Sequence, residues 1–307
     1  MTSAVTLTDA DFAHMKSIEV LGLNGVSSVT LGANASAAGV VTVVTGSGNT
    51  SITDSDRALA VNAAALGAGA LLTLAGSSAD LVTGLTGNLS ATSDSGALGV
   101  TTGATTALSI ATGTGLSLID ASAMTSGDTL TLTGAHNAEL TVGGNLAAGR
   151  DAGALIVIAT GTGPQTIETG SGADWITATH GGDTIEGGGG GDSINVVGHK
   201  VADDFVYSAT SHSLNTAVGH DAIAGFVANS TFRDVVDFSS LNSSLTIAGL
   251  LKSSSVAADS IGWLYSGGKA LIYAKDTSGA LTTSSSSLME ITLSGVSSGL
   301  SASNFKA

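Results

Sequence analysis

The stretch that decides the fold is residues 169–195, which divide into three successive groups of nine. Residues 169–177 read Thr-Gly-Ser-Gly-Ala-Asp-Trp-Ile-Thr, residues 178–186 read Ala-Thr-His-Gly-Gly-Asp-Thr-Ile-Glu, and residues 187–195 read Gly-Gly-Gly-Gly-Gly-Asp-Ser-Ile-Asn. An aspartate stands at position six of each group and an isoleucine at position eight. A glycine-rich turn, an acid and an aliphatic residue repeated every nine residues predict a parallel β-roll that binds Ca²⁺.

Each position of the repeat has a physical role. Glycine adopts φ > 0 at low cost and lets backbone carbonyls approach closely. Aspartate supplies oxygen to Ca²⁺, which takes about six to eight oxygen ligands at about 2.3–2.6 Å. Alternate repeats lie on the same side of a roll, so a site should join each repeat to the second one after it. The pattern predicts that Asp174 and Asp192 share one site, while Asp183 faces the repeats before and after the run.

Two further carboxylates follow the run. Asp203 and Asp204 are candidates to complete the site that Asp183 begins, although a carboxylate at the start of a strand is an equally good interpretation. His180 lies in a predicted turn, and because calcium takes oxygen we expect its carbonyl to contribute and its ring to face solvent. The candidate calcium-binding residues are Asp174, Asp183, Asp192, Gly170, Gly172, Gly181, Gly188, Gly190, Asp203 and Asp204.

Degenerate copies of the nonapeptide precede the stretch and lack its acid. A longer strand-and-turn unit also repeats, with copies at residues 21–25, 72–76 and 130–134. Together these repeats predict that the solenoid begins near residue 18, each coil burying its apolar face only against its neighbours. In the degenerate nonapeptides, position six is held by Thr50, Ser117 and Gln165.

The composition changes at residue 198, after which aromatic residues cluster. Larger side chains there predict a conventional core that caps the solenoid. The expected fold class is all-β: a parallel β-solenoid or β-roll with calcium-binding nonapeptides and a C-terminal β-sandwich-like cap. The expected domains are a lead-in at 1–17 with a short helix through about Lys16 that Thr8 and Asp11 cap, a degenerate-repeat solenoid at 18–168, the calcium β-roll at 169–197, and a capping domain at 198–307.

The amino-acid composition narrows the classes of fold and of partner further. Of 307 residues, 43 are glycine, one is proline, none is cysteine, and 11% are charged, which favours a repetitive all-β chain over a helical enzyme. A net charge of −15 with only nine Lys and Arg argues against a nucleic-acid partner. The absence of cysteine excludes a disulfide framework and thiolate metal ligands. No run approaches the roughly 20 apolar residues of a membrane span.

Enzyme motifs are weak in this sequence. Residues 295–299, Gly-Val-Ser-Ser-Gly, match a nucleophile elbow by spelling, but no histidine follows them as the hydrolase order requires. There is no His-Glu-x-x-His motif, and the glycine run at 187–191 lacks the Lys-Ser/Thr of a phosphate loop. We also expect none of the six histidines to pair with a carboxylate at ligand spacing. The sequence therefore predicts no catalytic activity.

Trp175 is either a lone exposed aromatic residue or a contact to a neighbouring subunit or ligand.

With those residues in view, the chain resembles RTX (repeats-in-toxin) proteins exported by the type I secretion route. The three intact nonapeptides carry this resemblance. The segment with Asp204-Phe-Val-Tyr, Asp221-Ala-Ile-Ala-Gly-Phe and Asp234-Val-Val-Asp-Phe is similar to the one that follows the roll in serralysin-type proteins. The end of the chain, from Trp263-Leu-Tyr to Asn304-Phe, is similar to the C-terminal domain of calcium-dependent bacterial S-layer proteins and large adhesins.

The resemblance implies an uncleaved C-terminal secretion signal in the domain at 198–307, export by type I machinery, and calcium-triggered folding outside the cell or at its surface. Residues 1–17 contain neither a basic n-region nor an apolar core, which predicts no cleavable secretory signal. The expected function is a secreted calcium-binding structural protein that self-assembles at the bacterial surface, as an S-layer or extracellular matrix. Its expected partners are copies of itself, with cell-surface polysaccharide as a further candidate. The alternatives are the C-terminal module of a large adhesin, or of an RTX enzyme whose catalytic domain is absent here.

Overall fold

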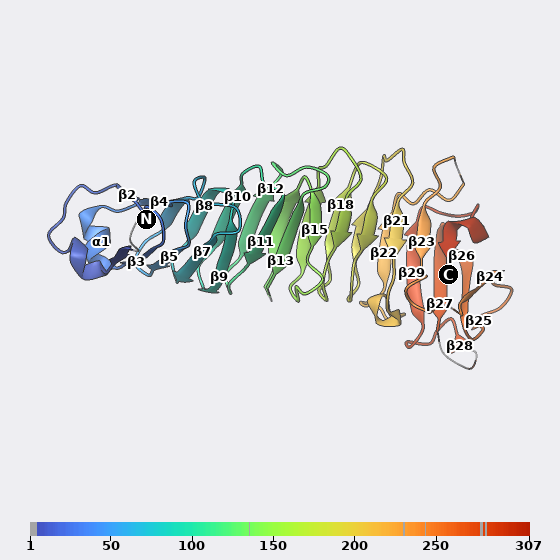
Figure 1. Ribbon diagram of the computed structural model, residues 1–307. Coiled ribbons are helices and arrows are strands. Elements are labelled where there is room, and N and C mark those ends of the chain that lie inside the picture. Colours follow the sequence, from blue (N-terminus) through green and yellow to red (C-terminus); the bar gives the residue numbers. More distant parts are fainter. Residues whose placement is uncertain (1–4, 135, 230, 243, 277–278, 280) are drawn as a thin grey trace. The chain divides into compact units, whose positions relative to one another are not determined.

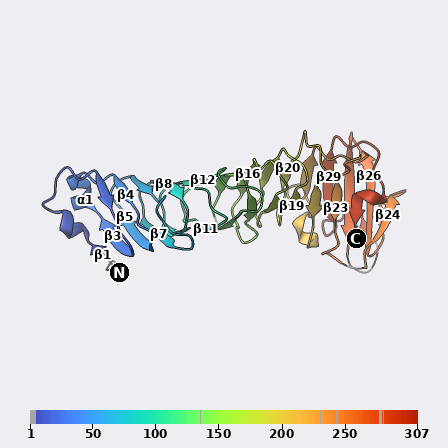
Figure 2. The ribbon, with the colours of Figure 1, turned by 45° about the horizontal axis from the view of Figure 1, so that its top comes forward.

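A computed structural model describes residues 5–134, 136–229, 231–242, 244–276, 279 and 281–307. Contacts between Cα atoms divide the chain into two compact units, residues 1–145 with 150–153, and residues 146–149 with 154–307. Each unit is built mainly from short strands stacked as parallel coils (Figure 1; Figure 2). The predicted all-β solenoid is therefore confirmed. Residues 1–4 of the expected lead-in lie outside the described part of the chain.

The first unit holds two sheets of parallel strands, and each coil contributes one strand to each sheet. The first sheet has the order β1 (Val5–Leu7), β3 (Ser27–Leu31), β5 (Thr50–Asp54), β7 (Leu71–Gly76), β9 (Asn88–Asp94), β11 (Ala107–Ala111) and β13 (Thr129–Thr133). The second has the order β2 (Val20–Gly22), β4 (Thr42–Val44), β6 (Leu59–Asn62), β8 (Asp80–Leu85), β10 (Leu98–Thr102), β12 (Ser117–Ala121) and β14 (Ala138–Val142).

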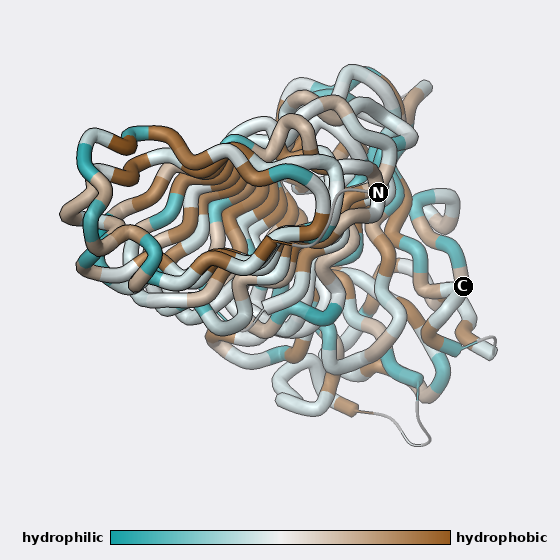
Figure 3. The backbone as a smooth tube through the Cα atoms, turned by 60° about the vertical axis from the view of Figure 1, so that its left-hand side comes forward, coloured by the Kyte–Doolittle hydropathy of each residue, from teal (hydrophilic) through white to brown (hydrophobic). Residues whose placement is uncertain are grey.

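Alternation of side chains explains why these coils stack. In β12 the burial alternates residue by residue, as expected for a strand with one face inward. Across the second sheet, Val82, Val100 and Ile119 occupy matching positions on neighbouring strands, and all three are buried. Figure 3 shows the result as hydrophobic segments that recur from one coil to the next. Each coil thus buries its apolar side chains mainly against the coils beside it.

The first unit also contains two short helical segments. The predicted capping box is present, because the backbone N–H of Thr8 donates to the Asp11 carboxylate at 2.8 Å. It caps only a 3-10 turn, η1 (Asp9–Phe12), rather than a helix that continues to Lys16. The helix α1 (Ala33–Ala38) was not predicted, since six small residues show no apolar periodicity. Asp9 holds its first turn by accepting the Ala35 N–H at 2.9 Å.

The second unit continues the parallel coils well beyond residue 197, where the sequence loses its nine-residue period. One sheet has the order β15 (Asn145–Ala147), β17 (Thr166–Glu168), β19 (Thr184–Glu186), β21 (Asp204–Val206), β23 (Val235–Asp237) and β30 (Phe305–Lys306). The other has the order β16 (Leu155–Ala159), β18 (Trp175–Ala178), β20 (Ser193–Asn195), β22 (Asp221–Ala224), β29 (Met289–Ser294), β27 (Lys269–Lys275), β26 (Ser260–Ser266) and β24 (Thr246–Leu250).

The end of the chain departs from the coil pattern. The strand β27 pairs antiparallel with β26 on one side and with β29 on the other. A separate antiparallel pair joins β25 (Ser255–Val256) to β28 (Leu281–Thr282). Two further 3-10 turns, η2 (Thr210–His212) and η3 (Ala302–Asn304), lie between strands. No helix in the described ranges is long and apolar enough to cross a bilayer.

Position eight of the nonapeptide forms the interior of the second unit, as the sequence predicts. Ile176, Ile194 and Ile223 stand in register in one sheet, and each is almost completely buried. In the other sheet Ile185 pairs with the larger Phe205. Aromatic pairs then take over the core, including Trp263 and Phe305, whose ring centroids are 5.0 Å apart.

Candidate metal centre

Position six of each nonapeptide lies just before a strand, so the strand register decides which aspartates meet. In the sheet that contains β18 and β20, Asp174, Asp192 and Asp221 occupy matching positions on three neighbouring coils. The Oδ1 atom of Asp192 accepts the Asp174 N–H at 2.9 Å, and Oδ1 of Asp221 accepts the Asp192 N–H at 2.9 Å. Each carboxylate is thereby fixed to the backbone of the preceding coil. We call this row the first aspartate ladder.

The opposite sheet carries a second aspartate ladder, formed by Asp183, Asp203 and Asp234 before β19, β21 and β23. The hydrogen bonds repeat: Oδ1 of Asp203 accepts the Asp183 N–H at 2.9 Å, and Oδ1 of Asp234 accepts the Asp203 N–H at 2.9 Å. Gln165 stands at the preceding position, and its N–H donates to Oδ1 of Asp183 at 2.8 Å. The degenerate repeat therefore keeps the geometry of the ladder without its charge.

The aspartates of the two ladders differ in the partner of the second carboxylate oxygen, Oδ2. The Oδ2 atoms of Asp183, Asp192 and Asp203 are fully buried and accept no hydrogen bond from any residue that the structure describes. At the last rungs the protein supplies a donor: the Tyr207 hydroxyl donates to Oδ2 of Asp221 at 2.9 Å, and the Val227 N–H donates to Oδ2 of Asp234 at 2.7 Å. Buried polar atoms in folded proteins nearly always have partners, so the three oxygens point to a missing one.

The electrostatics of the ladders lead to the same conclusion. Burial, and after it the charge of Asp221, raises the pKa of Asp192 to about 9. Burial also raises the pKa of Asp221 to about 7 and that of Asp203 to about 6. Stacked carboxylates in a dry interior cannot all ionise beside one another without a cation. Protonation is one way to relieve the repulsion, and a bound divalent ion is the other.

The predicted glycines allow the turns beside the ladders to stack closely. Gly188 and Gly190 have φ of 76° and 126°, values that side chains other than glycine rarely adopt. A Cβ atom at Gly188 would overlap the carbonyl oxygen of Gly170, and one at Gly190 would overlap that of Gly172. A Cβ at Gly181 would likewise overlap the carbonyl of Val201, on the side of the second ladder. All five predicted glycines thus lie in turns that pack on the next coil.

The structure does not bring every predicted residue into the ladders. Asp204 is one position too far along its strand, so its side chain points outward, where it forms an ion pair with Lys306. The interpretation of Asp204 as a strand-entry carboxylate fits this placement. The ring of His180 is exposed, as expected. Trp175 also faces outward, with 56% of its surface exposed.

Sequence reasoning missed Asp221 and Asp234 as members of the ladders. Their signal was present, because each is followed by a strand with an aliphatic residue two positions on, as Asp174 is. Long connections hid it: 29 residues separate Asp192 from Asp221, and 31 separate Asp203 from Asp234. The expectation that no histidine meets a carboxylate was wrong. His199 Nε2 lies 3.0 Å from Asp234 Oδ1, and His212 Nδ1 lies 3.5 Å from Glu186 Oε1.

The first unit holds a cluster of carboxylates that the sequence did not predict. Asp54 and Asp94 flank Gly76 on successive strands, and Asp80 begins the strand that follows Gly76. Each of the three is buried and has one carboxylate oxygen that accepts no hydrogen bond within the described ranges. Burial, followed by the charges of Asp94 and Asp54, raises the pKa of Asp80 to about 7. We call these three residues the Asp80 cluster.

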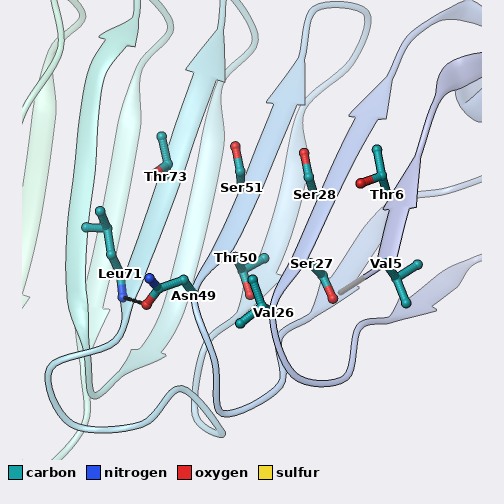
Figure 4. Close-up of a pocket in the computed structure, with 10 residues that line it drawn as sticks. All are labelled: Val5, Thr6, Val26, Ser27, Ser28, Asn49, Thr50, Ser51, Leu71 and Thr73. Carbon is teal, nitrogen blue, oxygen red and sulfur yellow. Dashed lines mark hydrogen bonds between the residues drawn. The ribbon is translucent and has the colours of Figure 1, made fainter. Parts of the chain in front are cut away.

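A hard divalent cation fits the donor chemistry of these sites. The first ladder and the Asp80 cluster present carboxylate oxygens, the first ladder beside turns whose carbonyls are close-packed, and Ca²⁺ takes oxygen ligands. In the second ladder His199 adds a ring nitrogen beside Asp203 and Asp234. The hollow in Figure 4 is different in kind. It lies over β1, β3, β5 and β7 on the outer face of the first unit, and none of its ten lining residues has an ionisable side chain. Its polar groups are hydroxyls and the Asn49 amide, whose Oδ1 accepts the Leu71 N–H at 3.0 Å.

Comparison with known proteins gives a likeness among solved structures. No protein-family model matches the sequence, and no curated protein does. Among solved structures, the chain is similar to the solution structure of the AlgE6R3 subunit from the Azotobacter vinelandii mannuronan C5-epimerase. The two are 23% identical, the match covers 50% of this chain and 77% of that one, and the TM-score is 0.36.

Proposed function

We propose that this chain is a secreted, calcium-binding structural protein that assembles with copies of itself at a bacterial cell surface. The pair of aspartate ladders is the observation that supports calcium binding. The carboxylates of the ladders are buried and stand in register. The second oxygens of Asp183 and Asp192 accept no hydrogen bond in the described chain, so these carboxylates have the chemistry of an incomplete oxygen cage. Calcium supplies the charge and the coordination that such a cage lacks.

The residues that would hold calcium follow from the ladders. On the first side they are Asp174 and Asp192 with the turns that contain Gly170 and Gly188; on the second side Asp183 has the same position. The Asp80 cluster is a further candidate in the first unit. The bound ion would neutralise the stacked carboxylates and so favour their ionised form.

Calcium also explains how folding would be delayed until export. At Kd values of about 10⁻⁴–10⁻³ M, such sites are empty at the low calcium of a cytosol and filled at millimolar calcium outside. Each site then adds RT ln(1 + [L]/Kd), about 1.4 kcal/mol at ten times Kd. Several sites would together supply a large part of the stability of a domain, which is typically about 5–15 kcal/mol. The chain would stay unfolded for a type I exporter and fold on release.

Self-assembly is supported by the outer faces of the sheets. In the first unit Leu81 and Leu118 are about half exposed and lie on the same face, with Gly99 between them. In the second unit Ile156 and Trp175 are exposed neighbours in register. With only 11% charged residues in the chain, such faces are suited to lateral packing between copies.

A cell-surface polysaccharide is a further proposed partner. Thr6, Ser28, Ser51 and Thr73 stand in register across four strands of the first unit, and their side chains line the hollow drawn in Figure 4. A row of hydroxyls spaced by the width of a strand, about 4.8 Å, matches the hydroxyl-rich surface of a glycan.

The alternative function is a binding or secretion module, either the C-terminal part of a large adhesin or that of an RTX enzyme whose catalytic domain is absent here. Electron microscopy of the purified chain in millimolar calcium, and again after chelation, separates these functions. The proposal predicts ordered sheets or filaments that dissolve when calcium is removed. Particles that remain monomeric at high concentration in both conditions would exclude self-assembly and support the alternative, a binding or secretion module.

A further inference from the structure

The rung next to His199 differs chemically from the rest of the second ladder. His199 lies in the loop before β21, and its Nε2 atom is 3.0 Å from Asp234 Oδ1 and 3.8 Å from Asp203 Oδ2. One ligand atom from each of these three residues lies within 4.8 Å of the ligand atoms of the other two. The three side chains are buried, with 1% or less of each exposed. A nitrogen ligand and two carboxylates therefore converge on one dry point.

The second ring nitrogen of His199 is already committed. Its Nδ1 is 2.5 Å from the carbonyl oxygen of Val196, which can only accept, so Nδ1 carries a proton. This is how metal-binding histidines are commonly oriented, with one nitrogen donating to a backbone carbonyl and the other facing the metal. The ring of Phe232 packs edge-on against the imidazole, with the two ring centroids 5.9 Å apart.

Asp203 provides an independent indication of a missing ligand. Its Oδ1 accepts the N–H groups of Gly182 and Asp183, at 2.8 and 2.9 Å. Its Oδ2 accepts no hydrogen bond from the described residues and is fully buried on the side that faces His199. A buried oxygen in this position calls for either a donor or a cation.

The spacing of these atoms suits a small transition-metal ion better than calcium. Two ligands about 2.0–2.1 Å from a tetrahedral Zn²⁺ are separated by about 3.3 Å. The two distances from His199 Nε2, 3.0 and 3.8 Å, bracket that value. Calcium takes six to eight oxygens at about 2.3–2.6 Å and does not favour imidazole.

We propose that His199, Asp203 and Asp234 form a site for a divalent first-row transition metal of the Zn²⁺ class, chemically distinct from the all-oxygen calcium sites of the ladders. His199 Nε2, Asp203 Oδ2 and Asp234 Oδ1 are its ligands. In the metal-free protein a proton competes for Nε2: burial opposes it, but the Val196 carbonyl and the carboxylates of Asp234 and Asp203 raise the pKa of His199. Metal binding displaces that proton. A filled zinc site requires neither self-assembly nor secretion.

The test is isothermal titration of the full chain with ZnCl₂ in millimolar calcium, which occupies the oxygen sites first. We expect one zinc site in the unaltered protein, unchanged in the control His180→Gln, whose ring is exposed. In His199→Gln its affinity should fall by at least about tenfold. No zinc binding to the unaltered chain, or equal binding to His199→Gln, would overturn the site and leave His199 as a charged partner of two carboxylates.

Spectroscopy keeps the proposal testable where His199→Gln does not fold. Cobalt(II) added to the unaltered, calcium-loaded chain should give the intense visible bands of a low-coordinate site. X-ray absorption of the zinc-loaded chain should show one imidazole and oxygen ligands. A zinc spectrum with several imidazoles, or with oxygen alone, would overturn the assignment. Calcium-induced folding is followed in the same samples by circular dichroism, so failure of the zinc site and failure of the calcium proposal give different results.

Discussion

The Oδ1 atom of Asp192 accepts a hydrogen bond of 2.9 Å from the backbone N–H of Asp174, 18 residues earlier in the chain. Two nonapeptides make one coil at this point, so the bond joins the same position of successive coils. It holds the Asp192 carboxylate with one oxygen on the backbone and the other buried without a donor in the described chain. This arrangement turns a repeated sequence motif into a row of oxygen ligands.

Removing two carboxylates from the first ladder should abolish its response to calcium. In Asp174→Asn with Asp192→Asn, we expect the calcium-dependent gain in unfolding free energy to fall by about 1.4 kcal/mol for each ion lost, at calcium ten times Kd. Urea unfolding with and without calcium measures it. The matched control is Asp204→Asn, a carboxylate outside the ladder whose partly exposed ion pair with Lys306 is worth about 0–1 kcal/mol. An equal loss of calcium response in both variants would contradict the placement of the ladder.

The stacked turns should not tolerate a side chain at Gly188. In Gly188→Ala the new Cβ meets the Gly170 carbonyl oxygen and the residue keeps φ near 76°, so we expect a loss of roughly 1–3 kcal/mol and weaker calcium binding. In Gly189→Ala the nearest atom is the Ser171 Cα at 3.8 Å, and the effect should stay within about 0.5 kcal/mol. Thermal unfolding in calcium compares the two. A similar loss at both positions would mean that the turns do not pack as described.

Without calcium, the stability of the second unit should fall as the pH rises. Burial and the Asp221 charge raise the pKa of Asp192 to about 9 in the folded chain, against 3.8 for an ordinary aspartate. The folded state therefore holds its proton more tightly than the unfolded state. This stabilisation is complete below about pH 4 and is progressively lost up to about pH 9. Urea midpoints of the calcium-free protein across that window measure the slope.

The pH slope has its own internal control. In Asp192→Asn the titrating group is absent, so the decline should flatten. In saturating calcium the decline should be weaker or reversed, because calcium competes with the proton for the same oxygens. A calcium-free protein that becomes more stable toward alkaline pH would contradict the account of buried, uncompensated carboxylates.

The Asp80 cluster should behave as a second calcium site in the first unit. Asp80→Asn removes a carboxylate that is buried near Asp54 and Asp94, so near pH 8 the calcium-free protein should gain stability, by up to about 1 kcal/mol. The gain that calcium brings should shrink in the same variant. Melting temperatures with and without calcium show both effects. Unchanged calcium stabilisation would remove the cluster from the set of calcium sites.

Lateral assembly should depend on the exposed face that carries Trp175. Trp175→Ser removes the largest exposed apolar side chain on that face, and we expect its assembly in calcium to need a higher protein concentration. Val218→Ser is the control, because Val218 is 86% exposed but lies in a loop outside the sheet. Light scattering during calcium addition measures the threshold. The same threshold in Trp175→Ser and in the unaltered chain would place the contact on another face.

The sequence was most informative where the repeat is local. A period of nine, with Asp174, Asp183 and Asp192 at position six, was sufficient to predict the parallel coils, the inward isoleucines and the side of the roll that each aspartate occupies. The degenerate positions Thr50 and Ser117 were also placed correctly, since both are buried at the start of strands.

Non-local features escaped prediction because sequence spacing does not fix them. The Asp80 cluster depends on the register between strands, which sets Asp54 and Asp94 on either side of Gly76. His199 and Asp234 are 35 residues apart and meet only because β21 and β23 are neighbours. The long connections before Asp221 and Asp234 hide a spacing that the coils nevertheless preserve.

The most direct test of the calcium proposal is a calcium titration of the chelated 307-residue chain, followed by far-ultraviolet circular dichroism. We predict a cooperative gain of β-structure with a midpoint of about 10⁻⁴–10⁻³ M calcium, reversed by chelation and absent when magnesium replaces calcium. A spectrum that does not change with calcium at any concentration up to the millimolar range would contradict the claim that the aspartate ladders are calcium sites.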